Sequence, residues 1–335
     1  MEKMECPWTG LASIAPRRDL WPVIAALGGP EEADAADTHA WIAAGLSPGE
    51  AWSLGRAESW RGPHIRAGGP GWPARLGLVP FGPVALQYEG DLARLDAPGV
   101  AVVGARACTP YGRSWARRIA GAVAEAGGVV VSGLATGIDC EAHLAASGAT
   151  IAVLGQGLGL RMPVWQARAR AAILDRGGLV LSEFPPMAPG AAWTFPVRNR
   201  IITALSSTIV VVEAGLRSGA RNTASQGLTL GRDILAVPGP LEAPASEGCL
   251  ALLAEGAAVV TGVAVVLETA KLKSPVKRPA TREAKVLAAL QGGARTPAET
   301  MSRTGLSWVE VGASLGTLVV DGRVIRLPGQ RYQPA

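Results

Sequence analysis

Between residues 99 and 256, short apolar runs rich in valine and isoleucine alternate with longer stretches of mixed polarity. The apolar runs are VAVVGA (100–105), VVVSGLA (129–135), TIAVLGQG (150–157), GLVLSE (178–183), STIVVVEA (207–214) and DILAVPG (233–239). Near-continuous apolar runs are typical of strands buried on both faces of a parallel sheet. The remaining stretches predict helices over residues 109–127, 137–148, 164–177, 198–206, 219–231 and 246–256. The alternation predicts an α/β fold with a doubly wound, mostly parallel sheet.

The segments on either side of this region have a different pattern. Residues 1–80 hold short helical patterns, and in one of them Ser47 and Glu50 form a capping-box pair with Pro48 at the first helical position. Residues 271–281 are basic and contain prolines without apolar periodicity, which predicts a linker. Stretches 282–293, 296–305 and 307–322 predict three helices, and 323–333 predicts a β-hairpin, the order found in winged-helix domains.

The chain therefore divides into four predicted parts. They are a small helical domain (1–80), an extended Rossmann-like domain (81–270), a linker (271–281) and a winged-helix domain (282–335). Winged-helix domains bind DNA in some proteins and only protein partners in others. The helix over 307–322 carries little basic charge, so the sequence leaves both roles open.

The charge of the chain is concentrated in the central domain. The 335 residues carry a net charge of +5, and residues 101–240 alone hold 13 arginines and no lysine against seven acidic residues. Arginine suits bidentate contact with phosphate and stacking on bases. The distribution favours a polyanionic partner for this domain.

The cysteines and the apolar stretches indicate the cellular compartment in which the protein is expected. The four cysteines are widely spaced without a C-x-x-C pair, which argues against a zinc site and favours a reducing cytoplasm. The N-terminal segment lacks the pattern of a signal peptide, and the apolar stretches near 201–212 and 256–267 are too short to span a bilayer. We expect a cytoplasmic protein without a membrane partner.

Candidate binding residues follow the ends of the predicted strands. In open α/β sheets, ligands bind in the crevice beyond the carboxyl ends of the strands. Glycine turns at helix starts expose N–H groups that bind anions, and arginines add positive charge. The residues at these places are Gly104, Arg106, Gly133, Ser218, Gly219, Arg221 and Asn222. The FPVRNR segment adds Phe195, Arg198, Asn199 and Arg200 immediately before an apolar run.

Several enzyme classes lack support in the sequence. Neither GARACTPYG nor GQGLGL matches the G-x-G-x-x-G dinucleotide fingerprint, and no G-x-x-x-x-G-K-[ST] loop is present. His143 lies in a predicted helix without a serine or cysteine partner by spacing, so we expect it to pack rather than to catalyse. Asp139, near the start of that helix, suits a structural N-terminal carboxylate. The sequence predicts no catalytic residues, no metal site and no cofactor.

Eight segments in consistent order resemble the DNA-processing protein A family (DprA, also called Smf). They include SGLATGIDCEAH (132–143), FPVRNRIITALSS (195–207) and SGARNTA (218–224), within about residues 100–260. The resemblance implies a non-catalytic homodimer that binds single-stranded DNA and loads the RecA recombinase onto it during natural transformation. It implies a DNA pocket formed by Gly104, Arg106, Gly133, Phe195, Arg198, Asn199, Arg200, Ser218, Gly219, Arg221 and Asn222. Three places depart from the family pattern: MPVWQ (162–166), the Gly-Cys-Leu at 248–250 and the Arg-Asn pair of SGARNTA.

Two alternative functions remain open at this stage. One is a nucleoside-phosphate hydrolase that uses the same crevice, although the stretch SGARNTASQG lacks the double glycine and the glutamate of such enzymes. The other is an interaction module that binds a small nucleotide. Salt dependence separates them, because a bound strand releases many counterions and one small anion releases few.

Overall fold

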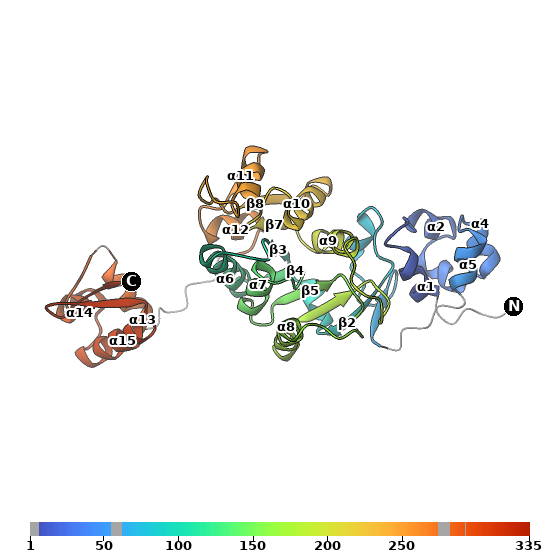
Figure 1. Ribbon diagram of the computed structural model, residues 1–335. Helices are drawn as coiled ribbons and strands as arrows, with labels where there is room; N and C mark the ends of the chain where they lie inside the picture. Colours follow the sequence, from blue (N-terminus) through green and yellow to red (C-terminus); the bar gives the residue numbers. More distant parts are fainter. Residues whose placement is uncertain (1–6, 55–61, 274–281, 292) are drawn as a thin grey trace. The chain divides into compact units, whose positions relative to one another are not determined.

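The computed structural model describes residues 7–54, 62–273, 282–291 and 293–335 (Figure 1). The chain forms two compact units, Met1–Ser274 and Pro275–Ala335. Residues 274–281 of the predicted linker lie outside the described residues. Within the described residues, no helix is long and apolar enough to cross a membrane.

A nine-stranded sheet organises the first unit. Its spatial order is β1-β2-β6-β5-β4-β3-β7-β8-β9, and the seven strands from β6 to β9 are parallel. The central strands are β3 (Gly99–Val103), β4 (Val129–Ser132), β5 (Thr150–Leu154), β6 (Leu179–Ser182), β7 (Thr208–Val211) and β8 (Asp233–Ala236). These six were predicted from the apolar runs, and the α/β class with a mostly parallel sheet is confirmed. The chain runs from β3 through β6 in one direction and returns through β7 in the other, so the order reverses beside β3.

Helices cover both faces of this sheet. One face packs against α6 (Pro110–Glu125), α7 (Ile138–Ala145), α8 (Val164–Asp175) and α12 (Val263–Thr269). The other packs against α9 (Thr194–Ala204), α10 (Gly219–Thr229) and α11 (Glu247–Ala254). Figure 1 shows α9 and α10 on one side of the strands and α7 and α8 on the other. Val102 faces the first layer and Val103 the second, as alternate side chains of a strand must.

Three sheet strands and one helix start differ from the predictions. The strands β1 (His64–Arg66) and β9 (Ala258–Val259) are the two edges of the sheet, and β2 (Ala85–Gly90) lies between β1 and β6 and pairs antiparallel with both. Their short or half-exposed stretches lack the apolar signal of a central strand. The sheet therefore begins at His64, inside the range 1–80 predicted as a separate helical domain. The helix α9 begins at Thr194, four residues before the predicted start, because Pro196 is tolerated in a first helical turn.

The described residues between Pro7 and Asp96 form five short helices and two 3₁₀ turns in addition to β1 and β2. They are α1 (Pro7–Ile14), α2 (Trp21–Ala26), α3 (Pro30–Ala35), α4 (Thr38–Ala43), α5 (Pro48–Leu54), η1 (Ala74–Leu78) and η2 (Leu92–Asp96). Their core includes the fully buried Trp8 and Trp41 and extends to Val84 and to Ala85 at the start of β2. The Ser47–Glu50 capping box is present: the Glu50 N–H donates to Ser47 Oγ at 3.3 Å, and the Ser47 N–H donates to Glu50 Oε2 at 2.8 Å.

Glu50 makes the stability of this region sensitive to acid. Hydrogen bonds from Arg18 and Ser47 lower the pKa of its carboxyl from 4.5 to about 2. A carboxyl with a lowered pKa stabilises the fold fully above pH 4.5, and this contribution is lost as the pH falls toward 2. We therefore expect Glu50→Gln to be less stable than the wild type at pH 6 and equally stable near pH 2, in urea titrations at each pH. A stability difference that stays constant across this range would contradict the assignment.

The described residues of the second unit form three helices and a hairpin. They are α13 (Arg282–Leu290), α14 (Pro297–Thr304), α15 (Trp308–Val320), β10 (Val324–Leu327) and β11 (Arg331–Pro334). The two strands pair antiparallel, and α13, α15 and β10 share a small apolar core. The element order agrees with the prediction, while the assignment to the winged-helix class stays a prediction.

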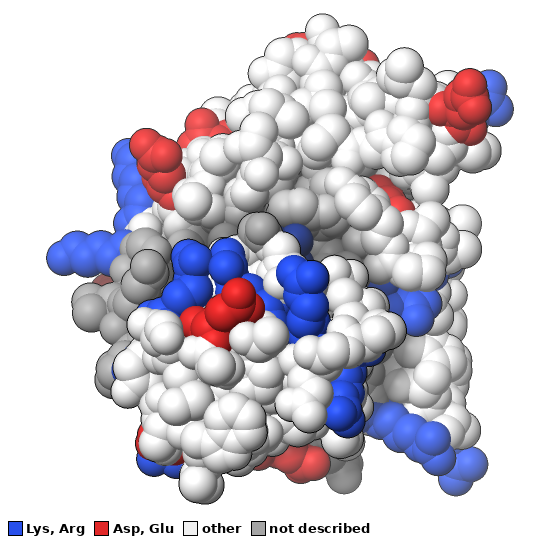
Figure 2. All heavy atoms as spheres, turned by 90° about the vertical axis from the view of Figure 1, so that its left-hand side faces the viewer, with Lys and Arg blue, Asp and Glu red and all other residues white. Residues whose placement is uncertain are grey.

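Charge is not spread evenly over the surface. In the view of Figure 2, most of the visible surface is neither acidic nor basic; some basic side chains surround an acidic one, and others lie away from any acidic side chain. The basic side chains visible in this view do not merge into one broad positive surface.

Candidate nucleic-acid interface

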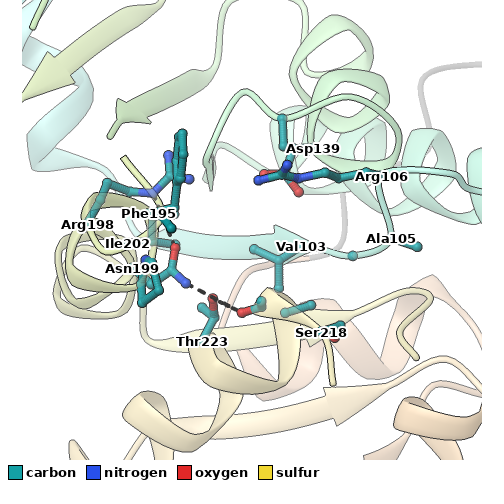
Figure 3. A pocket seen from close by; sticks show the side chains of 16 residues that line it. Val103, Ala105, Arg106, Asp139, Phe195, Arg198, Asn199, Ile202, Ser218 and Thr223 are labelled. Carbon is teal, nitrogen blue, oxygen red and sulfur yellow. Dashed lines mark hydrogen bonds between the residues drawn. The ribbon is translucent and has the colours of Figure 1, made fainter. Parts of the chain in front are cut away.

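A crevice lies beyond the carboxyl ends of β3 and β4, next to the point where the strand order reverses. Its volume is about 530 Å³. It is lined by Val103, Gly104, Ala105, Arg106, Ala135, Asp139, Ala192, Phe195, Pro196, Arg198, Asn199, Ile202, Ser218, Gly219, Ala220 and Thr223 (Figure 3). The position agrees with the general rule for ligand sites in open α/β sheets.

Arg106 and Phe195 form an arginine–aromatic pair at this crevice. The Arg106 side chain is exposed, and its Cζ atom lies 5.6 Å from the centroid of the Phe195 ring. Among the described residues, this ring is the only partner found for the Arg106 guanidinium. Phe195 also packs on Gly155, where an added Cβ would lie 2.8 Å from the ring. The pair therefore offers an unneutralised cation and a fixed aromatic face to a ligand.

Arg198 lies at the floor of the crevice and is 5% exposed. Its Nη1 donates to the carbonyl oxygen of Gly133 at 2.8 Å and to that of Val153, both at the ends of central strands. Burial lowers the pKa of Arg198 to about 10, with Asp139 opposing this change and Arg106 adding to it. Arg198 is thus protonated at neutral pH, and its positive charge lies at the floor of the crevice.

Asp139 brings a buried carboxylate to the same floor. Its Oδ2 accepts a hydrogen bond from the Gly133 N–H at 3.1 Å, in the first turn of α7. Burial raises the pKa of Asp139, and the charge of Arg198 opposes that rise. Sequence reasoning expected a structural carboxylate here and did not place it in the crevice; its position two residues after the Gly137 turn was the available signal.

The first turn of α10 forms the opposite wall. Ser218 caps this helix by accepting the Arg221 N–H at 3.3 Å, and Gly219 leaves the wall open because nothing lies within 4 Å of an added Cβ. Asn199 Nδ2 donates to Asn222 Oδ1 at 3.2 Å and so joins α9 to α10. The exposed N–H groups of a helix start and the adjacent amide are suited to an anion.

Arg200 has a different environment from Arg198, although the two are neighbours in the FPVRNR segment. Its guanidinium forms a two-point ion pair with the buried carboxylate of Glu183, with Nη1 and Oε2 2.8 Å apart. Its Nε donates to the carbonyl oxygen of Phe81 at 2.5 Å. Arg200 does not line the crevice, and its contacts hold α9 against the end of β6.

Some of the predicted binding residues line the crevice, and the others contact residues that line it or lie outside it. The crevice lining includes Gly104, Arg106, Phe195, Arg198, Asn199, Ser218 and Gly219. Gly133 lies directly behind the Arg198 guanidinium. Arg221 turns to Glu255 at 2.6 Å, and Asn222 supports Asn199. Thr223, Ile202 and Ala192 also line the crevice and carried no sequence signal beyond their place on α9 and α10 or just before α9.

His143 and the metal-ligating residue types give no sign of a catalytic group among the described residues of this region. His143, which the sequence predicted to pack, is buried with its Nδ1 2.7 Å from Thr150 Oγ1, and burial lowers the pKa of its ring to about 3. Within the described ranges, no group of three or more metal-ligating side chains is found. Besides the buried Asp139 carboxyl and several apolar side chains, the groups that line the crevice are two arginines, the Asn199 amide, backbone donors and one aromatic ring.

Comparison with known proteins gives the family. The family model described as DNA recombination-mediator protein A matches residues 64–271. Protein Smf of Escherichia coli K12 is 38% identical over 275 residues, which cover 77% of this chain and 74% of Smf. DNA processing protein DprA of Streptococcus pneumoniae R6 is 43% identical over 194 residues, covering 57% of this chain and 68% of DprA.

Solved structures agree with this result. The X-ray structure of DprA from Streptococcus pneumoniae matches with a TM-score of 0.66 at 33% identity and covers 76% of this chain and 93% of that one. A structure of DNA processing protein A from Helicobacter pylori, concerned with the single-stranded DNA binding mode of that protein, matches with a TM-score of 0.57 at 27% identity over 62% of this chain and 96% of that one. The resemblance drawn from the sequence is confirmed, and the chain belongs to the DprA/Smf family of DNA recombination-mediator proteins.

Proposed function

We propose that the crevice binds single-stranded DNA without catalysing a reaction on it. The observation that carries this proposal is the exposed Arg106 guanidinium over the Phe195 ring, opposite the open first turn of α10. Arg106 and the α10 N–H groups would neutralise phosphates, while Phe195 would stack a base. Stacking and phosphate contact do not depend on base identity, so binding would be largely independent of sequence.

We further propose that the protein acts as a homodimer that loads RecA recombinase onto the bound strand during natural transformation. Support comes from membership in a family described as recombination mediators. In such a role the protein holds and presents the strand, which needs donors and stacking surfaces rather than a nucleophile and a base. The groups that line the crevice meet that requirement.

Arg106→Ala tests the crevice directly. We expect weaker binding to all single strands alike and a log–log salt slope smaller in magnitude by about 0.7, as for the loss of one phosphate contact. Fluorescence anisotropy with labelled single-stranded and duplex oligonucleotides over a salt series measures both quantities. Arg176→Ala is a matched control, since this exposed arginine follows α8 at the edge where the strands begin.

Each outcome has a distinct meaning. Equal weakening in both variants would show a general charge effect and contradict the crevice as the strand site. Loss of binding to some sequences only would contradict a phosphate role for Arg106. Tight, salt-insensitive binding of a mononucleotide with no strand binding would support the nucleotide-ligand alternative instead.

A further inference from the structure

A second arginine–aromatic pair lies beside the crevice. The Cζ atom of Arg17, in the turn after α1, lies 4.8 Å from the centroid of the Trp193 ring. Trp193 is the residue immediately before α9, and 42% of it is exposed. An exposed cation over an exposed ring repeats the Arg106–Phe195 arrangement.

The Trp193 ring is held in place. One edge packs on the buried Phe184 ring, with centroids 5.9 Å apart and planes 75° apart. The backbone is fixed by the first turn of α9 and by Thr194, whose Oγ1 donates to the Ala191 carbonyl at 2.9 Å. A ring that is already ordered loses little conformational entropy when a base stacks on it. Trp193 is therefore preorganised as a stacking surface.

Arg17 differs from its neighbour Arg18. The Arg18 guanidinium pairs with Glu50 and donates to the Gly45 carbonyl at 2.5 Å, so its charge is used within the helical region. Arg17 is exposed, and across the described part of the chain its only partner is the Trp193 ring. An aromatic face does not neutralise a guanidinium, so Arg17 keeps a full charge for a phosphate.

The two pairs lie on either side of one helix start. Phe195 lines the crevice and Trp193, the N-cap residue two positions earlier, does not. Because successive helical residues are about 100° apart, we expect the two side chains to leave the helix start on nearly opposite sides. Between them, the exposed Ala192 and Pro196 belong to the crevice lining. A strand that leaves the crevice over this first turn meets Trp193 next, at a separation close to the width of a helix, roughly 10 Å.

We propose that Trp193 and Arg17 form a second single-strand subsite, at which a base stacks on Trp193 and Arg17 contacts the adjacent phosphate. This inference rests on the proposed function of the crevice and extends it into a path several nucleotides long. The helical N-terminal region thereby takes part in DNA binding through Arg17. The ligand class is single-stranded nucleic acid long enough to occupy both pairs.

The test compares two oligonucleotide lengths, because only the longer one can reach the second subsite. With Trp193→Ala we expect unchanged affinity for an oligonucleotide of about 4 nucleotides and roughly tenfold weaker affinity for one of about 16. Trp193→Phe keeps an aromatic face and should restore most of the affinity. Trp165→Ala is the matched control, since Trp165 is 41% exposed and lies on α8. Arg17→Ala should reduce the salt slope for the long oligonucleotide only.

A second measurement is independent of affinity. Ultraviolet cross-linking of a 16-nucleotide strand that carries 5-iodouracil, followed by mass spectrometry, should place a cross-link on residue 193 in the wild type, and none at this position in Trp193→Ala, which has no ring for a base to stack on. Two outcomes for Trp193→Ala would overturn the proposal. One is an equal loss of affinity for the short and the long oligonucleotide; the other is unchanged affinity for both together with a lower melting temperature. The Arg17–Trp193 pair would then be a structural contact that fixes the helical region. If wild type and Arg106→Ala bind alike, the crevice proposal fails instead, and the two failures are distinguished.

Discussion

Arg200→Ala should lower the free energy of unfolding by about 3–5 kcal/mol, because it leaves a buried carboxylate without its counter-charge. The Glu183 carboxylate is fully buried and pairs with Arg200 through both oxygens. Burial raises the pKa of Glu183, and the Arg200 charge opposes that rise. Without Arg200, the carboxylate must either remain charged in an apolar environment or take up a proton. Denaturant titrations of the two proteins at pH 7 measure the difference.

Two controls separate this effect from loss of a surface charge. Arg176→Ala removes an exposed arginine and should change stability by less than about 0.5 kcal/mol. The double variant Arg200→Met/Glu183→Met replaces both charges by apolar groups of similar volume and should recover most of the lost stability. Equal midpoints for Arg200→Ala and the wild type would show that the ion pair does not stabilise the fold.

The sequence predicted the central strands because they are buried on both faces. Each of β3 to β8 lies between two helical layers, so its residues are apolar whichever way they point. The edge strands β1 and β9 are too short for such a pattern, with β9 exposed at both residues. Their pairing is decided by neighbours far away in the sequence, as in the register of β1 with β2.

The candidate site was predicted only in part, for a related reason. Turns after strands are local features, which is why Gly104, Arg106 and Gly219 could be placed in the crevice. The roles of Arg198 and Arg200 depend on partners that the sequence does not reveal, namely the Gly133 carbonyl for one and Glu183 for the other. From the sequence, the two arginines of this short motif could not be told apart. In the structure they differ because their side chains leave α9 in different directions and contact different partners.

Gly133→Ala should weaken single-strand binding at least about tenfold and lower the free energy of unfolding by about 1–3 kcal/mol. An added Cβ would lie 2.5 Å from Nη2 of Arg198 and 2.7 Å from its Cζ. A surface arginine could move aside, but this guanidinium is buried and donates to the carbonyl oxygens of Gly133 and Val153. Displacement would push the cation into the crevice where we propose that the strand binds, and would remove the Arg198 donor from two buried carbonyl groups. Anisotropy and denaturant titrations on the same preparation measure both effects.

Gly121→Ala is the matched control for Gly133→Ala. Gly121 lies inside α6, where an added Cβ meets nothing within 4 Å, so the same substitution should leave binding unchanged and stabilise the helix by about 0.5–1 kcal/mol. If Gly133→Ala bound strands as tightly as Gly121→Ala, the position of Arg198 would not matter for binding. The floor of the crevice would then be structural, and the strand would depend on Arg106, Phe195 and the first turn of α10 alone. Reduced binding in Gly133→Ala with stability close to wild type would instead mean that Arg198 moves aside easily and that its position matters to the DNA more than to the fold.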